Sequence, residues 1–319
     1  AGFSTGSVCR ITFVGACAYA SIRIDRFLPN PMPSMHTDSD IDSKQKNIHA
    51  ATVEGFGDEW ARFDQSQLPD GESQQMFEEY FRVFPWDSLA VDAEGFDMGA
   101  GSGRWARRVA PRVGRLNCID ASDKALDVCR RQLASFGNVS FHAASVDAIP
   151  LPDASQDFGY SLGVLHHVPD TAQALKDIAA KLKPGAPFLV YLYYAFDNRP
   201  AAYRALWRLS NAIRALLSHS PTPVQFGTTA IIATLIYWPL ARVAALLDKF
   251  GALPLSWPLA LYRRHSFYVM RTAAFDRFCN PHEQHFPRVQ IMGMLDAAGL
   301  QGAKFCVPGP CGWVVATTS

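Results

Sequence analysis

Three glycines at alternate positions constrain this chain more than any other feature of its sequence. They occupy positions 99, 101 and 103, between a short apolar run and a helical stretch that follows Arg104. Glycine lets the backbone turn tightly, and a ligand can approach it with no Cβ in the way. The helix that follows offers unpaired N–H groups in its first turn. These residues therefore predict a strand, a ligand-binding turn and a helix.

The ligand of this turn is not decided by the glycines alone. Gly101, Gly103 and Ala106 also satisfy the looser G-x-G-x-x-G/A pattern of dinucleotide-binding turns. Asp97, two residues before the first glycine, favours another ligand. A carboxylate at that place suits the amino group and the sulfonium charge of S-adenosylmethionine better than it suits phosphates. The turn by itself leaves S-adenosylmethionine, a dinucleotide and a chance match open.

Strand and helix patterns alternate along the chain after this turn. The alternation predicts an α/β fold with a doubly wound, mostly parallel sheet and helices on both faces. Ligands of such sheets bind beyond the carboxyl ends of the strands. A hairpin across Pro308 and Pro310 is expected to add an antiparallel edge. The first expected strand ends at Asp97, and the others cover 115–120, 139–142, 157–162, 188–193, 302–307 and 312–317. The expected helices cover 103–109, 122–136, 171–182 and 289–298.

Two aspartates at strand ends are candidates for binding the nucleoside part of a cofactor. Asp120 ends the second strand, 23 residues after Asp97. A carboxylate at about this spacing can accept hydrogen bonds from both ribose hydroxyls. A helix N-cap is the alternative role of Asp120, although Ser122 can take it instead. Asp147 follows the third strand, where a carboxylate can accept from the adenine amino group, or can be an ordinary loop aspartate.

Five segments between residues 97 and 185 follow one another in the order and register of a known family. They are Asp97-x-Gly99-x-Gly101-x-Gly103, Asp120, residues 146–153, residues 157–170, and Leu182-Lys183-Pro184-Gly185. Together they resemble the class I S-adenosylmethionine-dependent methyltransferases, and most closely the ubiquinone/menaquinone-biosynthesis-like group of small-molecule enzymes. The resemblance covers about residues 90–195. The alternatives are a non-catalytic S-adenosylmethionine-binding protein on the same fold and a dinucleotide-dependent oxidoreductase.

The resemblance implies a Rossmann-like methyltransferase fold that binds S-adenosylmethionine and releases S-adenosylhomocysteine. It implies that Asp97 and the glycines hold the methionine part, Asp120 the ribose and Asp147 the adenine. The full set of expected cofactor-binding residues is Asp97, Gly99, Ala100, Gly101, Gly103, Asp120, Ala121, Val146, Asp147 and Leu162.

The resemblance supplies no catalytic residue, and methyl transfer does not always need one. The reaction is an in-line displacement on a carbon that the sulfonium already activates, so alignment and desolvation can provide most of the acceleration. A general base is needed when the acceptor arrives protonated. His166 and His167 follow the fourth strand, where such a base could lie. His167 is the candidate base, and a packing or capping histidine pair is the alternative.

The chain divides into four segments by composition. Residues 1–49 form an N-terminal extension, in which the apolar run 11–20 fits a targeting peptide, an upstream extension or a strand. Residues 50–195 form the cofactor-binding core, 196–286 an apolar helical cap inserted after the fifth strand, and 287–319 the helix and hairpin that complete the core. Phe56, Trp60 and Phe63 share one helical face, which either docks a helix or covers the cofactor as a lid.

The inserted segment is strongly apolar. A helix is expected over 201–217, and 226–240 is a run of 15 residues without a charge. A membrane span needs about 20 apolar residues, and Pro239 and Arg242 interrupt this run, so no spanning helix is expected. We expect a buried cap helix over the acceptor. An interfacial helix that reaches a lipid-like acceptor, with peripheral membrane contact, is the alternative.

Three residues are candidates for contacting the methyl acceptor. Tyr193 ends the fifth strand, and Arg264 and Tyr268 belong to a basic, aromatic cluster in the inserted segment. Residues 281–286 include two histidines and a glutamate, but the sequence offers no matching ligand set elsewhere, so no metal site is expected.

Composition limits the partners. The chain has 30 basic and 29 acidic residues, a net charge of +1, so no global field attracts nucleic acid. Its seven cysteines are scattered without a C-x-x-C pair, which is typical of reduced thiols in a cytoplasmic protein. The expected partner is therefore a small-molecule acceptor, apolar or lipid-like.

Overall fold

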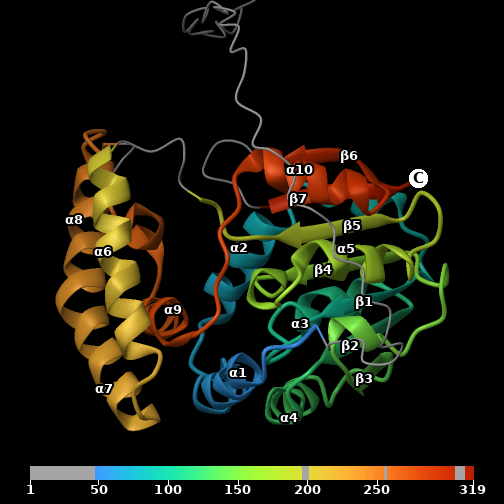
Figure 1. The fold of residues 1–319 in the computed structure, drawn as a ribbon, viewed down its shortest axis with the longest axis horizontal. Helices are drawn as coiled ribbons and strands as arrows, with labels where there is room; N and C mark the ends of the chain where they lie inside the picture. Colours follow the sequence, from blue (N-terminus) through green and yellow to red (C-terminus); the bar gives the residue numbers. More distant parts are fainter. Residues whose placement is uncertain (1–46, 196–200, 255–256, 306–312) are drawn as a thin grey trace, which may run out of the picture. The chain divides into compact units, whose positions relative to one another are not determined.

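The computed structural model describes residues 47–195, 201–254, 257–305 and 313–319. These residues form a seven-stranded sheet in the order β3-β2-β1-β4-β5-β7-β6, in which β3 to β5 are parallel and β7 and β6 are antiparallel (Figure 1). The predicted doubly wound, mostly parallel α/β sheet is confirmed. The strands are β1 Glu94–Met98, β2 Arg115–Asp120, β3 Val139–Ala143, β4 Phe158–Leu162, β5 Pro187–Tyr191, β6 Leu300–Phe305 and β7 Trp313–Thr318.

Helices cover both faces of this sheet. The α-helices are α1 Ala50–Arg62, α2 Asp70–Tyr80, α3 Ala106–Val109, α4 Asp123–Gln132, α5 Thr171–Ala179, α6 Ala201–Leu217, α7 Thr222–Ile232, α8 Trp238–Lys249, α9 Phe267–Cys279 and α10 Arg288–Ala297. The local signals explain several of their starts: the side chains of Ser122 and Asp170 cap α4 and α5, as predicted.

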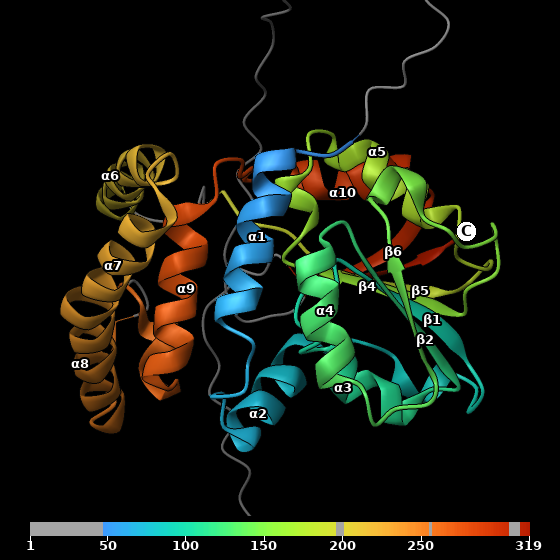
Figure 2. The same cartoon turned by 90° about the horizontal axis from the view of Figure 1, so that it is seen from below.

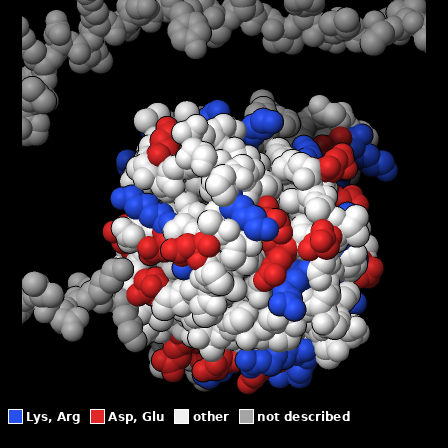
Figure 3. All heavy atoms as spheres, turned by 90° about the vertical axis from the view of Figure 1, so that its right-hand side faces the viewer, with Lys and Arg blue, Asp and Glu red and all other residues white. Residues whose placement is uncertain are grey.

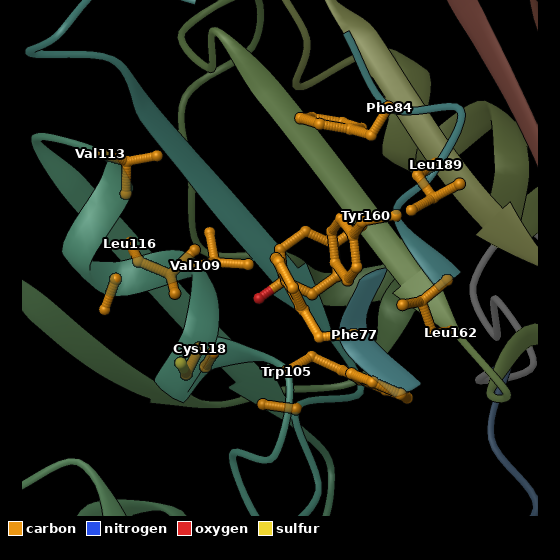
Figure 4. Close-up of a cluster of buried hydrophobic side chains, with 14 of the residues drawn as sticks. Phe77, Phe84, Trp105, Val109, Val113, Leu116, Cys118, Tyr160, Leu162 and Leu189 are labelled. Carbon is orange, nitrogen blue, oxygen red and sulfur yellow. The ribbon is translucent and has the colours of Figure 1, made fainter. Parts of the chain in front are cut away.

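Alternate strand residues divide the core into two layers. On β5, Leu189 joins a cluster with α2 and α3, whereas Phe188 and Val190 join a cluster with α5 and α10. This division follows from the two-residue period of a strand, and it leaves the central strands buried on both faces. Figure 4 shows part of the first layer, where Tyr160 and Leu162 of β4 lie among Phe77 and Trp105. The two layers fix where the carboxyl ends of the strands lie.

The C-terminal hairpin is present, with strand ends that differ from the predicted ones by one or two residues. The predicted pieces 302–307 and 312–317 correspond to β6 and β7, which pair with each other, and β7 also pairs with β5. The antiparallel edge is therefore confirmed and consists of two strands. The predicted turn at Pro308 to Pro310 lies outside the described residues, as does most of the predicted extension 1–49.

The inserted helices differ from the expectation of a buried cap. The structure joins α7 and α8 through a π-helical segment, Ala233–Tyr237, into one helix Thr222–Lys249 of 28 residues, which is long and apolar enough to cross a membrane. Only 22% of its most apolar window is buried. Pro239 does not interrupt the helix, because proline is tolerated in the first turn of α8 and the π segment accommodates it. The expectation of a buried helix is therefore wrong, and the helix is longer than the uncharged run 226–240 indicated.

Candidate active site

The glycine turn follows β1 and has the backbone conformation that its sequence predicts. Gly99, Gly101 and Gly103 have φ angles of 81°, 54° and 78°, in the left-handed region that disfavours side chains. The N–H groups of residues 99 and 100 both donate to the carbonyl of Ile119 on β2, at 2.8 and 3.0 Å. A Cβ on Gly101 would lie 2.9 Å from Nε1 of Trp60. The turn therefore places bare backbone directly beneath an aromatic side chain of α1.

Asp120, at the end of β2, holds this turn. Its Oδ2 accepts from the N–H of Gly101 and its Oδ1 from the N–H of Ser122, both at 2.8 Å. Burial raises the pKa of Asp120, and the two backbone donors oppose that rise. One carboxylate thus fixes the glycine turn and the start of α4, and it also faces the cleft described next.

A cleft opens at the carboxyl ends of β1, β2 and β4 and is lined on its other side by α1. Figure 2 shows the ribbon of α1 between α9 and α4. Seven of the ten predicted cofactor residues line the cleft, together with the predicted base His167. Those seven are Gly99, Ala100, Gly101, Asp120, Ala121, Val146 and Leu162. The remaining three lie close by with other contacts: Asp97 is buried behind the turn, Gly103 packs against Cys129, and Asp147 faces the segment before α1.

The roof of the cleft is helix α1, whose aromatic face was expected either to dock the helix or to cover the cofactor. Phe56 and Trp60 of α1 line the cleft, whereas Phe63 packs away from it against Phe275 of α9. The apolar face of α1 thus serves both alternatives that the sequence left open, since it docks the helix and covers the cleft. None of the described residues between 201 and 286 lines the cleft, so the inserted helices are not its roof.

The segment before α1 belongs to the site, although the predicted domain boundary at residue 50 left it out. Asn47 is buried and exchanges two hydrogen bonds with the backbone of Asp170, at 2.7 and 2.8 Å. Its own N–H donates to Oδ2 of Asp147 at 3.0 Å, and the hydroxyl of Ser145 donates to Oδ1. His49 caps α1 and lines the cleft. Asp147 therefore ties the start of α1 to the loop after β3.

Arg104 is a residue of the cleft that the sequence did not single out. Its guanidinium is stacked 4.3 Å above the ring of Trp105 and lies 5.9 Å from that of Trp60. Burial lowers its pKa, and the neighbouring Tyr80, Asp276 and Glu59 oppose that shift. The signal in the sequence was a basic residue directly after the third glycine, which is also common on exposed helix starts. The site thus holds a buried cation beside the glycine turn.

Asp97 lies at the carboxyl end of β1, and its carboxylate is buried beside the hydroxyl of Tyr160. Burial raises its pKa to about 8, Asp120 adds to the rise, and Tyr160 and Arg104 oppose it. A buried acid whose pKa is raised in the folded state binds its proton there more tightly than in the unfolded chain. The folded state therefore loses stability as pH rises from about 4 towards 8.

Replacement of Asp97 by asparagine should therefore stabilise the fold in a pH-dependent way. The melting temperature of Asp97→Asn should exceed that of the wild type, and the difference should grow from pH 5 to pH 8, because the buried carboxyl must take up a proton on folding whereas the amide is neutral at every pH. Thermal unfolding followed by circular dichroism measures this. The exposed Asp92→Asn is the control and should show no such trend. A difference that stays constant or shrinks with pH would contradict the assigned protonation of Asp97.

His167 has the geometry of a neutral base. Its Nδ1 lies 2.7 Å from the carbonyl oxygen of His282, which can only accept, so Nδ1 carries the hydrogen. Its Nε2 is buried and has no partner among the described residues, and the ring lines the cleft beside Phe56. Burial lowers the pKa of His167, and Asp276 and the His282 carbonyl oppose this shift. The ring is therefore an uncharged acceptor at the cleft wall.

The three predicted acceptor contacts do not line the cleft. The hydroxyl of Tyr193 donates to Asp276 at 2.6 Å, and its ring stacks on His166. The hydroxyl of Tyr268 accepts from the N–H of Gln65 at 3.0 Å. The side chain of Arg264 is 68% exposed and pairs with Asp248 at 3.3 Å. Arg264 thus faces solvent and pairs with an acid of α8 instead of facing the cleft.

Residues 281–286 form a strap instead of a ligand set. Gln284 donates to the backbone carbonyls of His166 and Val168, at 2.9 and 2.6 Å, and Glu283 pairs with Arg277 at 2.7 Å. Among the described residues, no group of histidine, cysteine, aspartate and glutamate side chains is arranged to hold a metal ion. The strap instead supplies the carbonyl that orients His167.

Residues 96–190 match the model of a methyltransferase domain, a range that begins in β1 and ends in β5 and includes the glycine turn, Asp120 and His167. The chain therefore contains a methyltransferase domain of the S-adenosylmethionine-dependent class. Its predicted fold, enzyme class and cofactor are thereby confirmed. The methyltransferase is 29% identical to the demethylmenaquinone methyltransferase of Tropheryma whipplei over 172 residues, 53% of this chain and 70% of that protein.

A second relative and a solved structure are also similar to this chain. The ubiquinone/menaquinone biosynthesis C-methyltransferase of Hahella chejuensis is 31% identical over 134 residues, which are 38% of this chain and 53% of that protein. Among solved structures, an O-methyltransferase family protein from Burkholderia thailandensis superposes with a TM-score of 0.48 and 16% identity, over 84% of this chain and 59% of the other.

Proposed function

We propose that the methyltransferase binds S-adenosylmethionine in the cleft beneath α1 and transfers its methyl group to an apolar small molecule. The observation that carries this proposal is that one cleft is lined by the positive-φ glycine turn, by Asp120 and by a buried neutral histidine. In a parallel sheet, this edge is where ligands bind. The ribose hydroxyls then donate to Asp120, and Arg104 supplies a buried guanidinium for the carboxylate of the cofactor.

The acceptor is proposed to lie between α1 and the loop after β4. The side chains Val53, Phe56, Val164 and Val168 line that part of the cleft, next to His167. Burying apolar ligand surface contributes about 25 cal/mol per Å² before ordering costs, so an apolar acceptor suits these walls. Two relatives are named for menaquinone and ubiquinone biosynthesis, which supports an apolar, lipid-like acceptor. The roof of the acceptor is then α1, in place of the predicted cap 196–286.

The transfer follows from this geometry. The acceptor atom attacks the methyl carbon, the carbon–sulfur bond breaks, and the cofactor leaves as neutral S-adenosylhomocysteine. When the acceptor is a hydroxyl, its proton passes to Nε2 of His167, the ring nitrogen that carries no hydrogen. The His282 carbonyl then stabilises the resulting imidazolium through Nδ1. Phe56 and Trp60 exclude water from the reacting atoms.

Turnover of acceptors that differ in polarity tests the proposed acceptor class. Formation of S-adenosylhomocysteine should rise with acceptor hydrophobicity and should change little across a salt series, because apolar burial is not screened by ions. Apolar phenols, sugars and anionic acceptors make a suitable series. Activity that collapses with salt and ignores hydrophobicity would contradict the proposal, and absence of S-adenosylhomocysteine with every acceptor would favour a non-catalytic binding protein.

Replacement of His167 tests the proposed base. For a hydroxyl acceptor, His167→Gln should lower kcat by about 10²–10⁴-fold and leave S-adenosylmethionine affinity unchanged. A base must be deprotonated, and burial lowers the pKa of His167, so the wild-type rate should fall only below the ordinary histidine value of about pH 6.5. That acid limb should disappear in the variant. The exposed His219→Gln is the matched control, and unaltered turnover in His167→Gln would exclude the histidine as base.

A further inference from the structure

The helices inserted after β5 carry an exposed apolar surface. Most of the large apolar side chains that are exposed in the described residues lie on α6, α7, α8 and the segments that join and end them. They are Leu206, Leu209, Ile213, Leu216, Val224, Ile231, Leu235, Ile236, Trp238, Val243, Leu246 and Phe250. We refer to these twelve side chains as the insertion face. Soluble proteins rarely expose large contiguous apolar areas without a partner.

The other side of the same helices is fixed to the rest of the protein. Ala233, Tyr237 and Ala241 are buried against Met270 and Ala274 of α9. The small residues let the long helix lie close to α9, and the π-helical turn at 233–237 is part of this contact. The helix 222–249, about 42 Å long at 1.5 Å per residue, is therefore held along one stripe. Several of its apolar side chains outside that stripe are exposed when only the described residues are considered.

The charges around the insertion face are mainly basic, and its one acid, Asp248 of α8, pairs with Arg263 and Arg264. The sequence of α6 contains Arg204, Arg208 and Arg214 and no acid, and residues 215–241 contain neither an acid nor a lysine or arginine. Arg204 and Arg208 are exposed. The side of the molecule turned away from these helices is different: Figure 3 shows lysine, arginine, aspartate and glutamate interspersed there. An apolar surface flanked by arginines is complementary to a bilayer with anionic headgroups.

A second copy of the chain fits this surface less well. A two-fold contact brings the same patch of both subunits together. Neither α6 nor α7 has an acid to pair with Arg204 and Arg208, and Asp248 of α8 is already paired with Arg263 and Arg264. Like charges brought together at an interface are repulsive. A bilayer, by contrast, offers phosphates that can bind the arginines and acyl chains that can contact the apolar side chains.

We propose that the insertion face is a membrane-binding surface that lies in the headgroup and upper acyl region of an anionic bilayer. Trp238 and the leucines of α6 to α8 enter the acyl boundary, and Arg204 and Arg208 contact the phosphates. Membrane binding does not depend on the identity of the methyl acceptor, and it would bring the cleft close to any acceptor that is dissolved in the lipid.

Vesicle sedimentation with matched variants tests this surface. The full chain is mixed with phosphatidylcholine vesicles and with vesicles that also contain phosphatidylglycerol, and the bound fraction is measured. The wild type should sediment with the anionic vesicles, and its tryptophan emission should shift to the blue by more than that of Trp238→Phe, because the chain has seven tryptophans. Leu235→Asp, at a side chain 69% exposed, should weaken binding at least tenfold. Val91→Asp, at a side chain 93% exposed before β1, should leave binding unchanged.

Two further readouts separate the possible outcomes. Arg204→Gln with Arg208→Gln should remove the preference for anionic over neutral vesicles. S-adenosylmethionine binding, measured on each variant, should stay at the wild-type level, so that loss of the membrane surface is distinguished from loss of the proposed cofactor site. Absence of sedimentation, or equal effects of Leu235→Asp and Val91→Asp, would overturn the proposal. A lipid-free dimer that Leu235→Asp dissociates would assign the face to a second copy instead.

Discussion

Gly101→Val is expected to abolish S-adenosylmethionine binding. The glycine has a φ of 54°, and a Cβ there would meet Trp60 at 2.9 Å. A β-branched residue in this conformation costs roughly 1–2 kcal/mol in strain alone. It would also place methyl groups between the turn and α1, where the cofactor must lie. Both effects should lower affinity by more than about 100-fold, measured by isothermal titration.

A control substitution at another glycine distinguishes a loss of the cofactor site from a loss of the fold. Gly137 lies in the loop before β3, has no atom within 4 Å of an added Cβ and is not in the left-handed region. Gly137→Val should therefore bind the cofactor as the wild type does. Wild-type affinity in Gly101→Val, with its circular dichroism spectrum unchanged, would show that the cofactor does not approach this turn.

Asp120→Ala should produce the second-largest loss of cofactor affinity. The carboxylate accepts from two backbone N–H groups at 2.8 Å and is proposed to accept from the ribose. A hydrogen bond to a charged group contributes about 1.5–3 kcal/mol, so loss of the ribose contacts and of the turn that they need should weaken binding about 100-fold or more. Titration calorimetry and thermal melts together report both effects.

Two further variants test whether the carboxylate of Asp120 is what binds the ribose. Asp120→Asn keeps one acceptor oxygen and presents an NH₂ group to the other N–H, so its affinity should lie between those of the wild type and the alanine variant. Asp127→Ala on α4 removes an exposed carboxylate that pairs with Arg130 and should have no effect. Equal affinities of all three variants and the wild type would contradict the ribose assignment.

The parts of the site that the sequence predicts are those encoded by local patterns. The positive-φ glycines, the strand end at Asp120 and the caps Ser122 and Asp170 each follow from a few neighbouring residues. Asn47 and Arg104 could not be found this way. Asn47 reaches the cleft through contacts with Asp147 and Asp170, more than 99 residues away in the chain, and no local periodicity reports such a contact.

The error in the inserted helices has a physical reason as well. Apolar composition does not distinguish a helix buried in a protein from one that faces a lipid, because both exclude water. The burial of Ala233 and the exposure of Leu235 in the same turn became visible only with α9 in place. The basic cluster around Arg264 was taken as an acceptor site because the sequence does not show that Asp248, 16 residues away, pairs with Arg264 in the folded chain.

Competition binding tests the central claim most directly. Radiolabelled S-adenosylmethionine is bound to the wild type, and S-adenosylhomocysteine and NAD are added in turn as competitors. We predict one saturable site that S-adenosylhomocysteine empties, that NAD leaves occupied, and that Gly137→Val retains but Gly101→Val lacks. Absence of saturable binding, or displacement by NAD at concentrations where S-adenosylhomocysteine has no effect, would contradict the assignment of this cleft to S-adenosylmethionine.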